Sequence, residues 1–154
     1  MKYLILSDIR SAHNVGAMFR TADGAGATKV FLAGYTPTPI DRFGRPQGEI
    51  EKTSLGACNT IEWEQITNLP QLIVDLRQSG VTVVAVEQSA TSVSLADFSV
   101  PDKVAYIMGN EVDGVSEDIQ KICDLTLELP MLGEKESLNV ATTAGIVLYH
   151  QIGK

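Results

Sequence analysis

The amino-acid sequence predicts an α/β protein with a mostly parallel sheet flanked by helices, in one domain over residues 1–154. Two observations lead to this fold class. Short apolar runs rich in β-branched residues alternate along the chain with segments of helical periodicity. The run from Val81 to Val86 is almost unbroken apolar, which is typical of a parallel strand covered on both faces. A hydrophobic content of 44% over this length is enough to form a buried core.

The strands are predicted from their apolar and β-branched residues. Five segments are predicted strands and a sixth is a weaker candidate: residues 3–7, 29–34, 81–87, 103–109 and 125–130, with residues 60–64 as the weaker one.

Capping residues and apolar spacing predict the helices that connect these strands. Asn14 is positioned to cap a first helix, which Gly26 would end. Asn68, followed by a proline in the first turn, begins a second helix that ends at Gly80. Ser116 precedes a short third helix.

The last predicted helix covers residues 138–152 and is apolar nearly all round. A helix with no polar face is buried deeply or forms a subunit interface. We therefore expect this segment to lie in the core or against a second copy of the chain.

Composition excludes several classes of protein. The net charge of −7 argues against a general nucleic-acid binder. Two distant cysteines and two histidines argue against a metal site. No apolar run is long enough to span a membrane, and no signal peptide is recognisable, so we expect a cytoplasmic protein.

The charge is distributed unevenly. Residues 1–60 hold seven basic and five acidic side chains, whereas the rest of the chain holds five basic and 14 acidic ones. A polyanion such as RNA is therefore expected to contact the first third, through Arg42, Arg45 and Lys52. An ordinary solvated loop over residues 41–52 is an equally good interpretation.

Three segments combine residue types that suggest a ligand site. They are "NVGAMFRTADGAG" at 14–26, "IMGNEVDGVS" at 107–116 and "MLGEKESLNVATTAG" at 131–145. Each has an ordinary structural explanation: Arg20 as a surface arginine, Asp113-Gly114 as a turn, and Ser137 or Asn139 as a helix cap. The second segment, however, follows a buried strand, where open α/β sheets bind ligands.

Together the three segments resemble the signatures of the SpoU-type (TrmH-like) RNA ribose 2′-O-methyltransferases of the SPOUT superfamily. The signatures stand here as Asn14-Val15-Gly16…Arg20-Thr21, Gly109-Asn110-Glu111…Gly114 and Pro130-Met131-Leu132-Gly133…Ser137-Leu138-Asn139-Val140. The similarity spans nearly the whole chain. Two positions depart from the family pattern, namely Ala141 in place of a frequent serine and His150 in place of a common acidic residue.

The resemblance implies a C-terminal deep trefoil knot whose loops hold a bent S-adenosylmethionine. Carried over by position, the residues expected around this cofactor are Glu87, Ile107, Met108, Gly109, Leu129, Met131 and Leu138.

The resemblance also implies methyl transfer from a sulfonium to a ribose 2′-hydroxyl of RNA. The family assigns the central catalytic role to the arginine at the position of Arg20. A guanidinium does not readily lose a proton, so we expect Arg20 to stabilise the developing alkoxide or to bind the neighbouring phosphate of the RNA. The other residues expected at the catalytic site, which would orient substrate or cofactor, are Asn14, Glu111, Ser137 and Asn139.

Partners follow from the same resemblance. Relatives are homodimers in which the first and last helices pack together, so we expect a homodimer. The chain corresponds to the catalytic core without an appended RNA-binding domain, which favours tRNA as the substrate. Two alternatives remain open: an rRNA 2′-O-methyltransferase, and a non-catalytic module that binds S-adenosylmethionine or RNA. A Rossmann-type enzyme is disfavoured because no Gly-rich turn follows the first strand.

Overall fold

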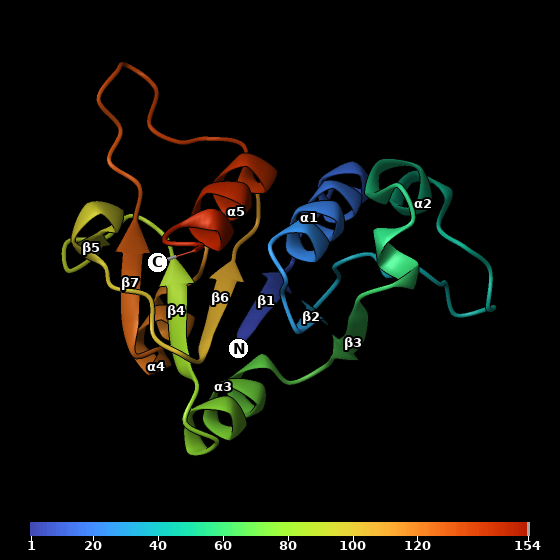
Figure 1. The fold of residues 1–154 in the computed structure, drawn as a ribbon, viewed down its shortest axis with the longest axis horizontal. Coiled ribbons are helices and arrows are strands. Elements are labelled where there is room, and N and C mark those ends of the chain that lie inside the picture. Colours follow the sequence, from blue (N-terminus) through green and yellow to red (C-terminus); the bar gives the residue numbers. More distant parts are fainter. Residues whose placement is uncertain (154) are drawn as a thin grey trace.

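The computed structural model describes residues 1–153, which form a seven-stranded sheet in which every neighbouring pair of strands is parallel (Figure 1). The spatial order is β3-β2-β1-β6-β4-β7-β5. The strands are β1 (Lys2–Ser7), β2 (Lys29–Ala33), β3 (Glu62–Ile66), β4 (Thr82–Val86), β5 (Val93–Ser94), β6 (Val104–Met108) and β7 (Leu125–Glu128). The predicted α/β class with a parallel sheet flanked by helices is confirmed, and the short β5 is an addition to the predicted strands.

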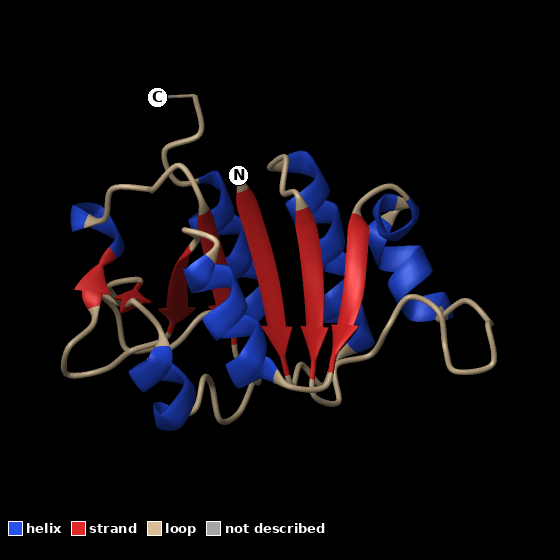
Figure 2. Ribbon diagram, turned by 90° about the horizontal axis from the view of Figure 1, so that it is seen from below, coloured by secondary structure: helices blue, strands red, loops and turns tan. Residues whose placement is uncertain are grey.

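Helices cover both faces of the sheet (Figures 1 and 2). The helices are α1 (Ala12–Gly24), α2 (Gly48–Ser54), α3 (Leu69–Gln78), α4 (Glu117–Ile122) and α5 (Val140–Tyr149). On one face α1 packs against both α2 and α5, and on the other face α3 contacts α4. Within the described residues, no helix has the length and apolar character that a membrane crossing would require.

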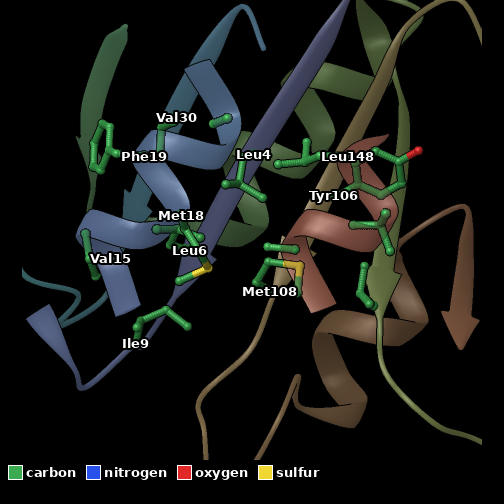
Figure 3. Packing of buried hydrophobic residues seen from close by; sticks show 14 of the residues in the cluster. Leu4, Leu6, Ile9, Val15, Met18, Phe19, Val30, Tyr106, Met108 and Leu148 are labelled. Carbon is green, nitrogen blue, oxygen red and sulfur yellow. The ribbon is translucent and has the colours of Figure 1, made fainter. Parts of the chain in front are cut away.

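The core is divided between the two faces because side chains alternate along each strand. In β6, Tyr106 and Met108 join the cluster beneath α1 and α5, together with Leu4 and Leu6 of β1 (Figure 3). Ile107 points the other way, into the cluster beneath α3 and α4. Both faces of the central strands are therefore buried, as the unbroken apolar runs indicate.

Two helices differ from the prediction. Ser11 caps α1, with its hydroxyl accepting a hydrogen bond from the Asn14 N–H at 3.2 Å, so the prediction of Asn14 as the cap was wrong. Asn14 lies within the first turn, and its side chain is free for other contacts. The helix α2 was not predicted, because it is short and Ile50 is the only large apolar residue that it buries.

The last helix is shorter than predicted, and one side of it is exposed within a single copy of the chain. It ends at Tyr149, and its buried residues are Ala144, Val147 and Leu148. Ile146 and Tyr149 are 39% and 50% exposed, because α5 packs with one side only on α1 and β6. The chain therefore leaves an apolar side of α5 uncovered.

Tyr106 places a polar hydroxyl inside this apolar core. Its side chain is fully buried, and its hydroxyl has no hydrogen-bond partner among the described residues. Burial accordingly raises the pKa of this phenol to about 12. A buried polar group without a partner is unfavourable, so Tyr106→Phe is expected to raise the free energy of unfolding by about 1 kcal/mol. Urea denaturation of both proteins measures this difference, and a less stable variant would contradict it.

Candidate active site

A cavity of about 590 Å³ opens at the carboxyl ends of three adjacent strands, β6, β4 and β7. Parallel strands end at the same edge of a sheet, and open α/β sheets bind ligands at this edge. The walls come from the segments that follow the three strands, residues 87–88, 109–114 and 129–139, and from the start of α5. The volume suits a cofactor-sized molecule.

Six of the seven residues predicted around a cofactor line this cavity. They are Glu87, Met108, Gly109, Leu129, Met131 and Leu138. The seventh, Ile107, does not line the cavity with its side chain. Its side chain is fully buried on the opposite face of the sheet, beside Ile5 and Ala85. Since alternate residues of a strand face opposite sides, Met108 and Ile107 cannot both face the cavity with their side chains.

The cavity also includes residues that sequence reasoning did not single out, among them Gln88, Glu128, Glu136 and Thr143. Gln88 and Glu136 meet across the opening, where the Gln88 amide donates to the Glu136 carbonyl at 2.7 Å. Glu128 is the last residue of β7, so its position at a strand end was the available signal.

The segment after β6 folds back on itself and is held by Glu87. One carboxylate oxygen of Glu87 accepts from the Val115 N–H at 3.0 Å, and the other accepts from the Gln88 N–H at 2.8 Å. Gly114, with φ of +68°, allows the turn, and its Cα lies against the Glu87 carboxylate. A Cβ on Gly109 would lie 2.2 Å from the Gly114 carbonyl carbon. The backbones of Gly109 and Gly114 therefore lie close together, and both residues form part of the cavity wall.

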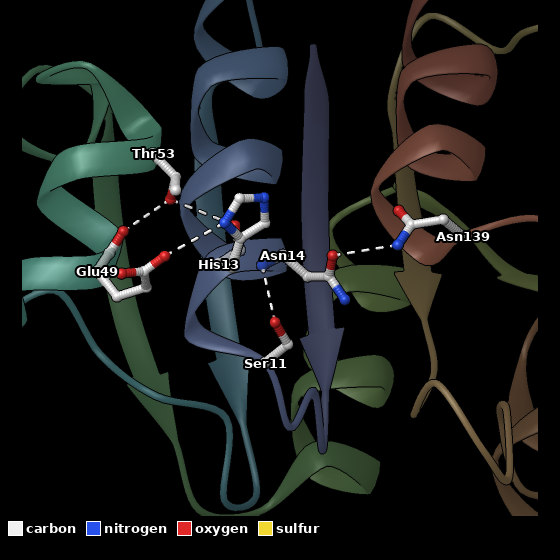
Figure 4. A network of polar contacts seen from close by, with 6 residues as sticks. All are labelled: Ser11, His13, Asn14, Glu49, Thr53 and Asn139. Atoms are coloured by element: carbon white, nitrogen blue, oxygen red, sulfur yellow. Dashed lines mark hydrogen bonds and ion pairs between the residues drawn. The ribbon is translucent and has the colours of Figure 1, made fainter.

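Asn14, Glu111 and Asn139, one from each signature, form a continuous hydrogen-bonded chain. The Asn139 amide donates to the Asn14 side-chain oxygen at 3.2 Å (Figure 4). The Asn14 amide in turn donates to the Glu111 carboxylate at 3.1 Å. The side-chain oxygen of Asn139 also caps α5 by accepting from two backbone N–H groups. These three residues therefore join the starts of α1 and α5 to the loop after β6.

Glu111 fixes the beginning of α1 as well. Its two carboxylate oxygens accept from the Arg10 N–H at 2.9 Å and the Ser11 N–H at 3.1 Å. Partial burial alone would raise the pKa of this carboxyl, but the hydrogen bonds from Arg10, Asn14 and Ser11 outweigh it and lower the pKa below the ordinary value of 4.5. Glu111 thus stabilises the fold in its ionised form.

Glu111→Gln is therefore expected to lower the free energy of unfolding at pH 7 by about 1 kcal/mol, after allowance for solvent screening of this exposed carboxylate. A lowered pKa in the folded state stabilises the protein above the ordinary carboxyl pKa, and this contribution disappears as the pH falls through the folded-state pKa. The difference between wild type and variant should thus shrink in acid. Denaturant unfolding at pH 7 and pH 3 measures it, and a difference independent of pH would contradict the assignment.

The remaining predicted catalytic residues lie apart from one another. Ser137 lines the cavity. Arg20 does not, because its exposed side chain lies beside a second cavity of about 570 Å³ between α1, α2 and α5. The residues around this second cavity are His13, Ala17, Arg20, Thr21, Lys52, Thr53, Leu55 and Tyr149, none of which lines the first. Within one copy of the chain, the structure does not bring Arg20 to the predicted cofactor residues.

The predicted RNA-binding residues fall into two groups. Lys52 lies with Arg20 at the second cavity. Arg42 and Arg45 lie on the exposed loop between β2 and α2, which is teal in Figure 1.

The charged residues that line the first cavity are all acidic. Five carboxylate residues line it, and no lysine, arginine or histidine of the described chain does. These five are Glu87, Glu111, Asp113, Glu128 and Glu136. Apolar side chains, including Met108, Leu127 and Leu129, form another part of the wall. Such a cavity favours a ligand that is cationic and partly apolar, and it disfavours one that carries phosphates.

Fold and cavity together define an α/β protein with a ligand-sized cavity at the carboxyl edge of a parallel sheet. Its sequence matches the SpoU rRNA Methylase family over residues 1–149. The chain belongs to this family.

Curated relatives and solved structures agree with this membership. The 23S rRNA (guanosine-2′-O-)-methyltransferase RlmB of Neisseria meningitidis is 34% identical over 94% of this chain and 55% of its own length. The same enzyme of Xanthomonas axonopodis is 33% identical over 97% of this chain and 57% of its own. The chain thus spans about half the length of the curated relatives it matches.

Two crystal structures have the same fold. An AdoMet-bound rRNA methyltransferase from Sinorhizobium meliloti superposes with a TM-score of 0.86 and 30% identity, over 97% of this chain and 54% of that one. A TrmH/SpoU tRNA modifying enzyme of A. aeolicus superposes with a TM-score of 0.84 and 26% identity, over 97% of this chain and 72% of that one.

Proposed function

We propose that this chain is an S-adenosylmethionine-dependent RNA methyltransferase that acts on a ribose 2′-hydroxyl of rRNA. The observation that carries the proposal is the acidic, partly apolar cavity at the carboxyl ends of β4, β6 and β7. Family membership and the curated names of the relatives support the reaction class.

The cavity suits S-adenosylmethionine better than other common cofactors. This cofactor carries a positive sulfonium and a positive amino group, which the lining carboxylates would attract. The two faces of its adenine base are apolar, and Met108, Leu129 and Leu138 offer apolar surface for them. NAD or a nucleoside phosphate would instead place phosphates among carboxylates. A relative of the same fold, the Sinorhizobium meliloti rRNA methyltransferase, binds AdoMet.

The substrate we favour differs from the one expected from the sequence alone. The small size of the chain favoured tRNA, but the curated relatives are named for action on 23S rRNA. The tRNA preference is therefore replaced by the rRNA alternative. Such a substrate would also agree with the cytoplasmic location expected from the sequence.

We also propose that a homodimer completes the site. Within one chain, Arg20 lines the second cavity, which shares no lining residue with the first. A catalytic Arg20 would therefore have to serve the first cavity of a second copy. The exposed apolar side of α5, with Ile146 and Tyr149, lies next to α1 and offers an interface for that copy. Light scattering at micromolar concentration tests this part of the proposal, and a monomer would contradict it.

Catalysis would depend mainly on orientation and charge. When bound, S-adenosylmethionine supplies an electrophilic methyl group. Arg20 would stabilise the negative charge that develops on the ribose oxygen, or hold the adjacent phosphate. Asn14, Glu111 and Asn139 would position the loops around the reacting groups through their hydrogen bonds. Ser137, at the rim of the same cavity, would contact substrate or cofactor.

The C-terminal segment would carry the trefoil knot that the family resemblance implies. Residues 129–139 form a long excursion after β7, shown in orange in Figure 1, and the chain then returns through α5 beside α1 and β6. This return path supports the proposal, as does the superposition on family structures over nearly the whole chain.

The reaction is tested by incubating the protein with methyl-labelled S-adenosylmethionine and with rRNA or tRNA from the same cells. We expect label in rRNA, and mapping of the product should place it on a ribose 2′-oxygen. Label in tRNA alone would reject the proposed substrate. Cofactor binding with label in neither pool would favour the alternative of a non-catalytic binding module.

A further inference from the structure

The loop between β2 and α2 is an ordered structure of its own. The Gln47 N–H donates to the Pro39 carbonyl, and the Asp41 N–H to the Arg45 carbonyl, each at 2.8 Å. Ile40 and Pro46 form an antiparallel bridge between them. Residues 39–47 therefore form a small closed hairpin.

Asp41 organises the tip of this hairpin. Its carboxylate accepts from the N–H groups of Phe43 and Arg45, at 2.8 and 2.9 Å, and from the Arg45 guanidinium at 2.9 Å. The Asp41 pKa is lowered, mainly by the backbone hydrogen bond from Arg45. The carboxylate is thus used inside the loop, where it holds the backbone turn and the Arg45 side chain.

Those side chains form an exposed stack of an aromatic ring and guanidinium groups. The guanidinium carbons of Arg42 and Arg45 lie 4.7 and 5.0 Å from the centre of the Phe43 ring. The ring is 66% exposed although phenylalanine is usually buried. Within residues 1–153, Arg42 has no carboxylate partner. The hairpin thus presents to solvent one aromatic ring and two guanidinium planes, of which that of Arg45 is paired with Asp41.

The base of the loop is joined to the first cavity. The Asn110 amide donates to the Tyr35 hydroxyl, and Asn110 lines that cavity. The Thr36 hydroxyl is buried and donates to the Leu6 carbonyl at the end of β1. The loop leaves the sheet from the same carboxyl edge as the cavity, but on the far side of β1 (Figure 2).

We propose that this hairpin binds a nucleobase of single-stranded RNA on the Phe43–arginine stack. Unpaired bases of RNA stack on aromatic rings and on guanidinium planes, and arginine also binds the adjoining phosphate. The proposal rests on the proposed function for its choice of ligand. Both RNA and an acidic protein would be attracted by the arginines. We favour RNA because the flat arginine–ring stack can contact a base while its charge binds a phosphate.

The test compares two labelled probes of about 12 nucleotides, a single-stranded RNA of mixed sequence and an abasic ribose–phosphate strand of equal length. By fluorescence anisotropy, wild type should bind the base-bearing strand more tightly. Phe43→Ala should weaken that binding about tenfold or more and leave the abasic strand unaffected. Phe43→Trp should retain the preference. Arg42→Gln should weaken binding to both strands and reduce the salt dependence.

Val74→Ala is the matched control, since Val74 is an exposed apolar residue on α3, away from the loop. It should bind as wild type does. If Phe43→Ala binds both strands like wild type, or instead changes only the oligomeric mass, the hairpin is not a base-binding element. Methyl transfer by wild type is measured separately. A protein that keeps the Phe43-dependent preference without transferring methyl groups would retain this inference and lose the proposed function.

Discussion

Replacement of Arg20 by alanine is expected to lower methyl transfer to RNA about 10²- to 10³-fold while leaving the affinity for S-adenosylmethionine unchanged. The guanidinium is the charge that would stabilise the reacting ribose oxygen, and it lies outside the first cavity of its own chain. Arg20→Lys should recover little, because an ammonium cannot reproduce the planar pair of donors. Single-turnover transfer rates and calorimetric titration of the cofactor measure the two quantities.

Mixing experiments test whether Arg20 acts at the cavity of the second copy. If Arg20 serves the second copy, an Arg20→Ala chain mixed with a chain defective in its cofactor cavity should regain part of the activity, since one site in the mixed dimer is intact. Equal inactivity before and after mixing would argue against a shared site. A variant that methylates at the wild-type rate would remove Arg20 from the mechanism.

Gly109→Ala should have the second large effect, on cofactor binding. The added Cβ would meet the Gly114 carbonyl carbon at 2.2 Å and the Val115 nitrogen at 2.3 Å. Both are backbone atoms, so the turn after β6 has to move, at a cost of about 1–3 kcal/mol. Because this turn is a wall of the cavity, we expect cofactor affinity to fall at least tenfold, as measured by calorimetry.

Gly133→Ala is the control for this substitution. Gly133 lies in the segment after β7, and a Cβ there would meet no atom within 4 Å. It should bind the cofactor like wild type and unfold at the same temperature. Equal effects of the two substitutions would mean that the close backbone contact at Gly109 does not shape the site.

The fold class was predictable because its signal is repeated along the chain. Apolar strands such as Val81–Val86 alternate with helical patterns, and each repeat supports the others. Individual helix boundaries were less certain. Asn14 has the residue type of a cap, but Ser11 stands three residues earlier and takes that role. A local pattern cannot tell which of two competent residues caps a helix when tertiary contacts engage one of them.

Without the family resemblance, the candidate site was predictable only where its residues come from strand ends. Gly109 and Leu129 follow predicted strands, so their position at one edge of the sheet could be inferred. The alternation that directs the Ile107 side chain to the other face of the sheet was also available from the sequence. The separation of Arg20 from the cavity was not, because spacing along α1 does not tell which neighbour a given side of the helix faces. The network of Asn14, Glu111 and Asn139 joins residues about 100 positions apart, which no local pattern contains.

The central position of β1 affects how the chain folds during synthesis. β1 precedes the other six strands along the chain, yet it lies inside the sheet between β2 and β6, and Lys2 pairs with Val104. The ribosome therefore has to synthesise the whole segment from β2 to β4 before this strand can pair with β6. Until then the nascent half-sheet leaves one row of backbone donors and acceptors open beside Leu4 and Leu6. Such an intermediate folds slowly and is prone to aggregation, so the newborn protein should depend on chaperones until the β6 segment emerges.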